Sequence, residues 1–384
     1  MRASYKKLIS FFLFSALLFF HPSIIFTQIT LRDKIAQMIM VGFSGTKLDD
    51  SLTVDLSQRN LGGVILFGWN CDNPVQIQTL TAKIRDAAKT PPFIAIDQEG
   101  GKVARLNAGN GFRNSYTAYE IGTMFNSADT AETQARTMAS WLAESGINLN
   151  LAPVVDVNVY PQSPAIGALG RSFSADPAEV SRYAALFIEE FHKKNVICTL
   201  KHFPGHGSAR NDSHLGFTDV TNTWTESELL PYQNLIAAGY NDMIMAGHLF
   251  NATIDSLYPA SLSYKTITGL LRQKLNFTGV VVSDAMFMRA VSDNYGFEEA
   301  IELAIRAGTD ILLYVTNLKD GLSLPLRVIN CIEQKIQDGV IPESRIDESF
   351  HRIMKLKNIY LQEITTTEKV PTLFDLRTYP NPFR

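Results

Sequence analysis

One short stretch of the chain concentrates the residue types that catalyse reactions. Between Lys201 and His214 lie three of the seven histidines of the sequence, together with Asp212. The apolar run 196–200 before this stretch predicts a buried strand, and Pro204 with its neighbouring glycines prevents that strand from continuing. We therefore expect the cluster in a loop at the C-terminal end of a strand, where binding and catalytic groups are commonly placed.

Two side chains of this loop, Asp212 and His214, form a candidate acid/base unit. A carboxylate beside an imidazole fixes the tautomer of the ring and raises its basicity, so that the histidine can give a proton and later take one near neutral pH. On these residues alone, a histidine that is merely hydrogen-bonded to a turn aspartate is an equally good interpretation.

Asp284 is a second candidate, because it ends the apolar run 280–282 after Ser283 and has no Lys or Arg next to it in sequence. A carboxylate in such surroundings costs free energy unless it is paired. It is therefore expected either to carry out chemistry or to cap a helix. We favour a nucleophile over a cap.

Strand-like apolar runs recur along the chain and alternate with helix-compatible segments such as 131–144 and 177–193. Most runs are continuous rather than alternating, as expected when both faces of a strand are buried. The pattern predicts a parallel α/β sheet closed into a barrel. The alternative is an open, doubly wound sheet, but no Gly-x-Gly-x-x-Gly turn follows the first strand. The expected strands are 37–42, 63–67, 93–97, 149–156, 196–202, 243–248, 280–284 and 311–314.

Polar residues follow these runs with one polarity. Asp97, Asp156, the pair Lys201 and His202, His248 and Asp284 all lie at or just beyond the C-terminal end of a predicted strand. In a (β/α)₈ barrel these ends converge on one mouth, whereas an open sheet would spread them along a line. We therefore predict a single TIM-like (β/α)₈ barrel, with irregularities allowed.

Composition excludes several classes of protein. The chain has 384 residues, is 46% hydrophobic and carries a formal charge of −3, so a sizeable core is expected and no polyanion partner is indicated. Its Lys and Arg residues are scattered, which argues against nucleic-acid binding. Cys71, Cys198 and Cys331 are far apart and odd in number, and they predict neither a disulfide framework nor a zinc ribbon. Cys198 is interpreted as a small buried hydrophobe.

Residues 1–28 have the layout of an export signal. Arg2, Lys6 and Lys7 precede an apolar block from Leu8 to Phe20, after which polar residues return. The block is too short to favour a membrane span, and an uncleaved N-terminal anchor is the alternative. We predict an exported protein, periplasmic or secreted, with no stable membrane insertion once the signal is removed. Residues 29–361 are expected to form one catalytic domain, whose last amphipathic helix extends from Ser349 to Leu361, and residues 362–384 a C-terminal tail.

Four motifs, in order and at compatible spacing, resemble glycoside hydrolase family 3, in particular its bacterial β-N-acetylglucosaminidase branch. The motifs are Ile96 to Gly101 with Val103 and Arg105, Gly170 to Phe173, Lys201 to Gly207 with Asp212 to His214, and Ser283 to Met286. The similarity extends over roughly residues 31–361. It implies a TIM-like barrel and the retaining hydrolysis of a terminal β-linked sugar.

The resemblance also implies roles for individual residues. Asp284 matches the nucleophile of the family, and His214 with Asp212 matches the acid/base dyad of the N-acetylglucosaminidase branch. Positions that hold the sugar correspond to Asp97, Arg105, Arg171, Lys201 and His202. The implied activity is exo-hydrolysis of non-reducing terminal N-acetylglucosamine from peptidoglycan fragments or related glycans. A carbohydrate substrate, a monomer, and neither a cofactor nor a metal are expected.

Three alternatives remain at this point. His202, His206, Asp212 and His214 have the chemistry to hold a zinc ion in a metal-dependent hydrolase, although Pro204 prevents the helical spacing common in such sites. A non-catalytic saccharide-binding protein on the same barrel is the second alternative, since a fold does not determine function. As the third, Asp97 and Glu99 share a strand face and are a possible acid pair, but we interpret Glu99 as an ion-pair member.

Overall fold

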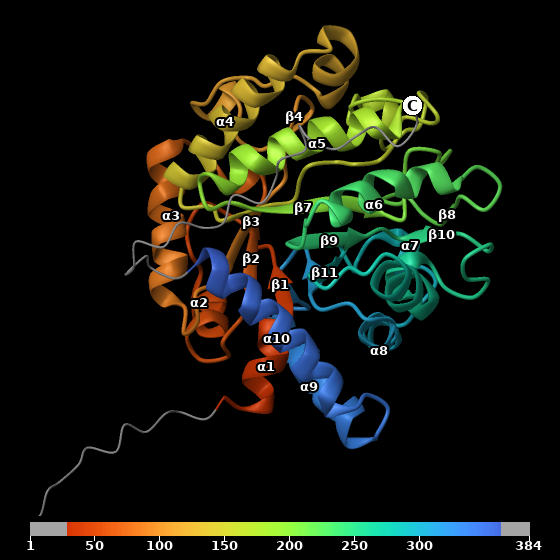
Figure 1. Cartoon of the computed structure of the whole chain (residues 1–384). Helices are drawn as coiled ribbons and strands as arrows, with labels where there is room; N and C mark the ends of the chain where they lie inside the picture. Colours follow the sequence, from red (N-terminus) through yellow and green to blue (C-terminus); the bar gives the residue numbers. More distant parts are fainter. Residues whose placement is uncertain (1–28, 362–384) are drawn as a thin grey trace, which may run out of the picture.

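Eight parallel strands lie side by side in the computed structural model, which describes residues 29–361 (Figure 1). Their order is β11-β9-β7-β6-β3-β2-β1-β12, and a bridge between Val282 and Ile311 joins the two outer strands, so the sheet closes. This confirms the predicted (β/α)₈ barrel. The predicted export signal and the predicted C-terminal tail lie outside the described residues. The barrel strands are β1 (Ile39–Val41), β2 (Gly63–Leu66), β3 (Phe93–Ile96), β6 (Leu149–Asn150), β7 (Ile197–Phe203), β9 (Met243–Ala246), β11 (Val280–Ser283) and β12 (Leu312–Tyr314).

Helices follow the strands and surround the barrel (Figure 1). They are α2 (Asp50–Ser57), α3 (Pro74–Ala87), α4 (Ala128–Glu144), α5 (Pro177–His192), α6 (Leu230–Ala237), the π-helix η7 (Lys265–Lys274) and α8 (Phe297–Ala307). Before β1 lies α1 (Leu31–Gln37), and after β12 lie α9 (Leu324–Gln337) and α10 (Glu343–Tyr360). Short helices are η1 (Gly68–Asn70), η2 (Ala108–Asn110), η3 (Glu120–Phe125), η4 (Gly167–Leu169), η5 (Glu226–Leu229), η6 (Ala260–Leu262) and α7 (Arg289–Ser292). Small strand pairs complete the connections: β4 (Gln98–Gly100) with β5 (Val103–Ala104), β8 (Thr218–Asp219) with β10 (Leu249–Phe250), and β13 (Leu318–Lys319) with β14 (Leu322–Ser323).

The helix α5 shows how the sequence forms these elements. Asp176 caps its first turn by accepting the N–H of Ala178, and Pro177 occupies the first helical position, where its missing N–H costs nothing. Val180 and Ala184 are buried, and so are residues at the same helical spacing in the next two turns. This spacing gives the helix one apolar face toward the barrel.

Two predicted boundaries were wrong. The strand expected over 149–156 pairs as a strand only over Leu149–Asn150, because Pro153 has no N–H to donate, and Val154 bridges Lys201 alone. The last helix, expected from Ser349, begins six residues earlier, at Glu343. Its buried stripe already includes Ile346, which continues the helical spacing toward the N-terminus.

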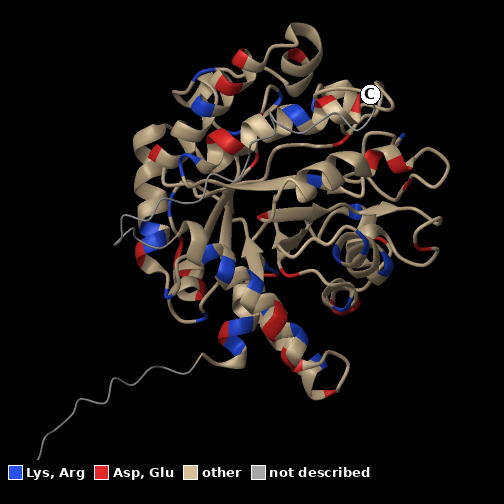
Figure 2. Ribbon diagram, viewed as in Figure 1, with Lys and Arg blue, Asp and Glu red and all other residues tan. Residues whose placement is uncertain are grey.

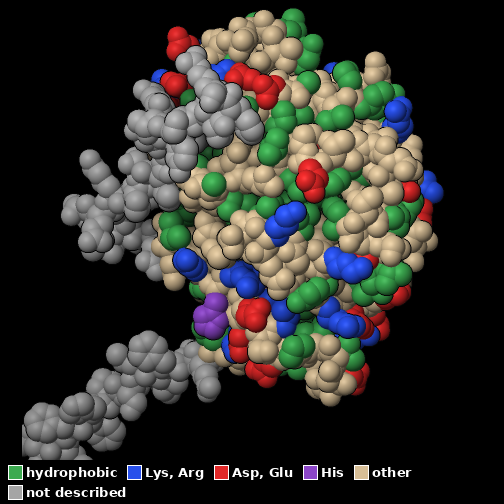
Figure 3. Space-filling model, turned by 45° about the vertical axis from the view of Figure 1, so that its right-hand side comes forward, with side chains coloured by type: hydrophobic (Ala, Val, Ile, Leu, Met, Phe, Trp, Pro, Cys, Tyr) green, Lys and Arg blue, Asp and Glu red, His purple; other side chains and the backbone are tan. Residues whose placement is uncertain are grey.

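Charged side chains lie mainly on the helices and loops around the barrel (Figure 2). On the face drawn in Figure 3, acidic and basic side chains are interspersed and apolar side chains are scattered among them. Within residues 29–361, no helix is both long enough and apolar enough to cross a bilayer.

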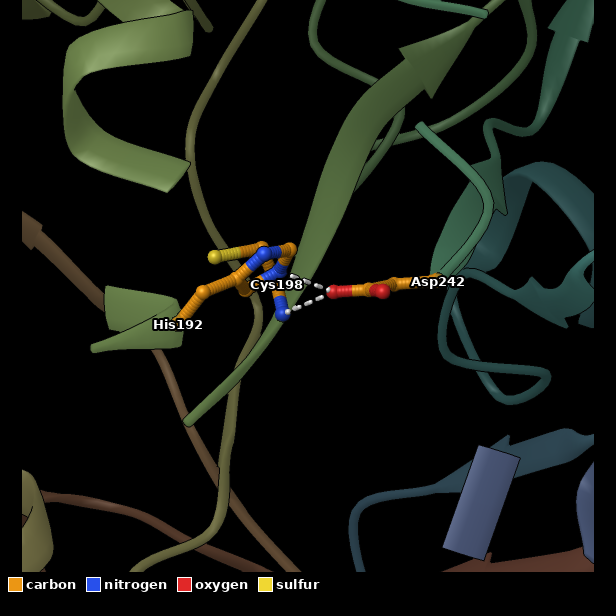
Figure 4. A group of neighbouring side chains, drawn as sticks. All are labelled: His192, Cys198 and Asp242. Atoms are coloured by element: carbon orange, nitrogen blue, oxygen red, sulfur yellow. Dashed lines mark hydrogen bonds and ion pairs between the residues drawn. The ribbon is translucent and has the colours of Figure 1, made fainter. Parts of the chain in front are cut away.

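A hydrogen-bonded cluster fastens the amino end of the barrel (Figure 4). The Asp242 carboxylate is 2.7 Å from His192 Nε2 and accepts the Cys198 N–H at 3.1 Å and the Tyr360 hydroxyl at 3.0 Å. Cys198 is fully buried, as predicted, and Figure 4 shows its sulfur directed away from this carboxylate. The cluster thereby joins α5, β7 and α10 to the loop before β9.

Candidate active site

Strand ends bring the predicted site residues to one mouth of the barrel. Asp97 follows β3, Lys201 and His202 lie near the C-terminal end of β7, and Asp284 follows β11. Since all eight strands are parallel, these positions lie at the same end. Arg105 and Arg171 reach it from the loops after β5 and η4.

Lys201 is a buried cation between two acids. Its Nζ lies 2.8 Å from Asp97 Oδ1 and 2.7 Å from Glu99 Oε1, and Arg105 Nη2 lies 3.2 Å from Asp97 Oδ2. Burial would raise the pKa of Asp97, but the charges of Lys201 and Arg105 outweigh it and lower the pKa. Asp97 is thus an ionised hydrogen-bond acceptor.

Glu99 pairs with Arg171 through two parallel hydrogen bonds. Arg171 Nε donates to Glu99 Oε2 and Nη2 donates to Oε1, each at 2.8 Å, while Nη1 donates to the Ala165 carbonyl at 2.7 Å. Burial would raise the pKa of Glu99, but Arg171 and Lys201 hold it well below its usual value. The interpretation of Glu99 as an ion-pair member agrees with this geometry. Glu99 links Arg171 to Lys201, a role that its position two residues after Asp97 did not reveal.

His202 is oriented by Asp156. Its Nδ1 lies 2.7 Å from Asp156 Oδ2, and its backbone N–H donates to Oδ1 at 3.0 Å. The ring Nε2 lies 3.4 Å from Arg171 Nη2. Asp156 is fully buried, and its place at a predicted strand end was the sequence signal that could have added it to the site.

Asp284 is a largely buried, ionised carboxylate. It is 9% exposed, and its Oδ1 accepts the N–H of Ala285 at 2.8 Å. Burial would raise its pKa, but the neighbouring His248, His202 and His214 outweigh burial and lower the pKa to about 2. The group is therefore charged at neutral pH, as a carboxylate nucleophile must be.

His248 holds the backbone next to Asp284. Its Nε2 lies 3.0 Å from the Ala285 carbonyl, so this nitrogen carries the proton, and Nδ1 accepts the Ser261 hydroxyl at 2.6 Å. Burial lowers the pKa of His248, which favours the neutral ring that this arrangement needs.

Asp212 and His214 lie together on the loop after β7. His214 Nδ1 is 2.7 Å from Asp212 Oδ1, which also accepts the His214 N–H at 2.9 Å. The imidazole is 58% exposed, so its Nε2 is accessible. No hydrogen bond joins the pair to Asp284 among the described residues, but His214 is close enough to contribute to the lowered pKa of Asp284.

The loop histidines are engaged separately rather than converging on one point. His202 contacts Asp156, His206 Nε2 lies 3.1 Å from Ser213 Oγ, and His214 contacts Asp212. Within residues 29–361, the group of potential ligand atoms that lie within 4.8 Å of one another comprises His192, Cys198 and Asp242, at the opposite end of the barrel.

Comparisons with known proteins agree on one family. The model of the glycosyl hydrolase family 3 N-terminal domain matches residues 30–356. The beta-hexosaminidase of Tolumonas auensis is 36% identical over 301 residues, which are 75% of this chain and 87% of that protein. Beta-hexosaminidase A of Pseudoalteromonas piscicida is 33% identical over 339 residues, and the match covers 81% of this chain but only 56% of the relative. The solved glycoside hydrolase family 3 beta-N-acetylglucosaminidase from Paenibacillus sp. str. FPU-7 superposes with a TM-score of 0.78 at 33% identity, covering 86% of this chain and 62% of that one.

Proposed function

Because the chain belongs to glycosyl hydrolase family 3, we propose that it is a retaining β-N-acetylhexosaminidase that removes non-reducing terminal N-acetylglucosamine from peptidoglycan fragments or related glycans. The observation that carries this proposal is the pairing of two groups at one barrel mouth. Asp284 is a carboxylate with a pKa of about 2, and the hydrogen-bonded Asp212 and His214 lie on a neighbouring loop.

In the proposed first step, an Asp284 carboxylate oxygen attacks the anomeric carbon as the bond to the leaving oxygen breaks. His214 gives its Nε2 proton to that oxygen, while Asp212 holds Nδ1 and stabilises the imidazolium before the transfer. The neutral His214 then takes a proton from water, whose oxygen displaces Asp284 from the sugar. Two displacements at one carbon restore its configuration.

The remaining polar groups are proposed to hold the sugar. Asp97 and Lys201 form an ion pair at 2.8 Å. The remaining lone pairs of the carboxylate can accept hydrogen bonds from sugar hydroxyl groups, and the remaining N–H groups of the ammonium can donate to them. The other proposed sugar-binding residues are Arg105, Arg171 and His202. Glu99 holds Arg171 in place, and Asp156 holds His202. We further propose an exported monomer that works without a metal.

The test uses a chromogenic β-N-acetylglucosaminide, with and without a chelator, followed by proton NMR of the first-formed sugar. We expect turnover that the chelator leaves unchanged and the β-anomer before mutarotation. Loss of turnover on chelation supports the metal-dependent alternative. An α-anomer that appears first would exclude double displacement, and no turnover on any glycoside supports the saccharide-binding alternative.

A further inference from the structure

Two buried side chains lie beneath the loop that carries Asp212 and His214. The first is Glu228, which belongs to η5 and is fully buried. Its Oε2 accepts the backbone N–H of Gly207 at 3.0 Å and that of Ser208 at 3.3 Å. Glu228 therefore holds the start of the loop through two main-chain hydrogen bonds.

The fit around the start of the loop is close. A Cβ added to Gly205, whose φ is +128°, would lie 2.6 Å from Glu228 Cβ. A Cβ added to Gly207 would lie 1.6 Å from the Val157 carbonyl oxygen on the other side. The chain is thus confined between η5 and the segment that follows β6, and only glycine fits at these two positions.

The second buried side chain is His206, which is 2% exposed. Its Nε2 lies 3.1 Å from Ser213 Oγ, and its backbone N–H donates to Asp156 Oδ1 at 2.8 Å. Ser213 lies between Asp212 and His214, so His206 links the acid/base pair to the carboxylate that orients His202. Two hydrogen bonds made by His206, one from its backbone and one at its ring, thus connect Asp156 beside His202 to Ser213 in the loop.

Neither buried side chain is placed to exchange protons with a substrate. Burial lowers the pKa of His206 to about 4, so its ring is neutral where the enzyme is proposed to work. Burial, aided by the Asp156 charge, raises the pKa of Glu228 to about 7. Both groups are enclosed: Glu228 holds the loop backbone, and the His206 ring contacts Ser213 and the edge-packed His202 ring, whose centroid is 5.7 Å away.

We propose that His206, Ser213 and Glu228 are positioning residues that hold the loop so that His214 meets the leaving oxygen of the substrate. The inference rests on the proposed role of His214 as the acid. Displacement of His214 by about an ångström is enough to reduce proton transfer, because such transfer requires hydrogen-bond distance. Asp284 follows β11, and its carboxylate is held by the Ala285 N–H rather than by this loop.

The experiment compares kcat/KM for two substrates in Ser213→Ala, which removes the partner of His206, and Glu228→Ala, which removes the acceptor of the Gly207 and Ser208 N–H groups. Chitobiose has a poor leaving group that needs a proton, whereas a dinitrophenyl β-N-acetylglucosaminide has a leaving group that does not. We expect kcat/KM to fall by about tenfold or more on chitobiose and by less than about threefold on the dinitrophenyl substrate. A purely structural role would lower both values equally, through a smaller folded fraction.

Two further variants make the outcome decisive. Ser349→Ala removes another buried hydroxyl, which donates to Asp310 at 2.7 Å at the amino end of the barrel. This control variant should leave kcat/KM unchanged on both substrates. His214→Gly tests the premise: if it shows no difference between the substrates, the proposed acid is wrong. The positioning role is overturned if His214→Gly affects the two substrates differently but Ser213→Ala does not. In that case Ser213→Ala lowers kcat/KM equally on both substrates or on neither. Ser213→Ala decides alone if circular dichroism shows that Glu228→Ala does not fold.

Discussion

At Asp284, a carboxylate remains ionised although it is largely buried, because three histidines lower its pKa to about 2. The Ala285 N–H bonds one of its oxygens, which fixes the direction of the other. This combination of burial, charge and orientation is what a nucleophile toward an anomeric carbon needs. An N-cap role would instead require hydrogen bonds to the N–H groups two or three residues later, and no such bond is present among the described residues.

Asp284→Asn should remove nearly all turnover and leave the fold intact. The amide keeps the shape of the side chain but not its nucleophilicity, so kcat/KM should fall by about 10³-fold or more. Steady-state kinetics with the unfolding temperature measured in parallel test this expectation. Asp55→Asn, a buried carboxylate variant on α2, is the matched control and should retain its activity. Activity of Asp284→Asn within about tenfold of the wild type would place the nucleophile elsewhere.

His214→Gly should separate the two chemical steps. A substrate with a very good leaving group still glycosylates Asp284, but the loss of the base leaves water unactivated, so the glycosyl-enzyme accumulates. Mass spectrometry of the intact protein should show the added sugar, and azide should speed its removal by attacking without base catalysis. Equal losses on activated and natural substrates, without azide rescue, would assign His214 a structural role.

The pairings inside the site were the part that sequence reasoning did not supply. Each strand-end residue was visible as a polar group after an apolar run, and the motifs suggested its role. The partners Glu99 and Arg171, however, are 72 positions apart, and Asp156 and His202 are 46 apart. Such contacts depend on how the closed barrel brings distant loops together, which local patterns do not encode.

Elements that consist of a continuous apolar run were predicted well. Elements whose backbone departs from regular strand or α-helix geometry were not. All eight barrel strands were located, because each is a buried run between polar loops. The strand after Asn150 is interrupted at Pro153, where the ladder lacks a donor. The π-helix η7 was not predicted, since its residues follow no periodicity that distinguishes it from an α-helix.

The amino-end cluster gives a prediction for how elements are held together. Asp242→Ala removes the acceptor of the buried Cys198 N–H and one of two partners of the Tyr360 hydroxyl, which keeps His192 Nε2 at 3.1 Å. One unsatisfied buried donor costs about 1–3 kcal/mol, so the free energy of unfolding should fall by about that amount. Urea denaturation measures this loss, and kcat/KM at 25 °C should stay within about twofold, because the cluster lies opposite the mouth. An unchanged urea midpoint would show that α5 and α10 are held by their apolar faces alone.

In the whole molecule, the two ends of the barrel have separate tasks. Side chains that carry the proposed chemistry gather at the C-terminal ends of the strands, whereas buried polar groups at the other end join the sheet to α10. Asp310 there accepts from Arg272 at 2.6 Å and from Arg345 at 3.1 Å. Variants at this end should therefore change stability with little effect on catalysis.

Lys357 on α10 makes the stability of the whole molecule depend on pH. Its buried Nζ donates to Gln37 Oε1 at 2.7 Å and to the Gly62 carbonyl at 2.8 Å, and no acid within residues 29–361 pairs with it. Burial lowers its pKa to about 7, against about 10.4 in the unfolded chain. Between these values the folded state binds fewer protons, so the stability contribution of this group rises with pH, and its full cost is present below pH 7.

Lys357→Met should therefore change the unfolding temperature in a pH-dependent way. The apolar side chain removes the cost of burying the charge, so the variant should gain a few degrees relative to the wild type at pH 6. This advantage should shrink or reverse at pH 9.5, where the wild-type amine is neutral and keeps both of its hydrogen bonds. Differential scanning calorimetry at the two pH values measures the difference, and Lys83→Met, at an exposed lysine of α3, should show no such trend. A difference between Lys357→Met and wild type that is the same at both pH values would mean that Lys357 stays charged in the folded protein, stabilised by its two acceptors and the Phe93 ring 4.7 Å away.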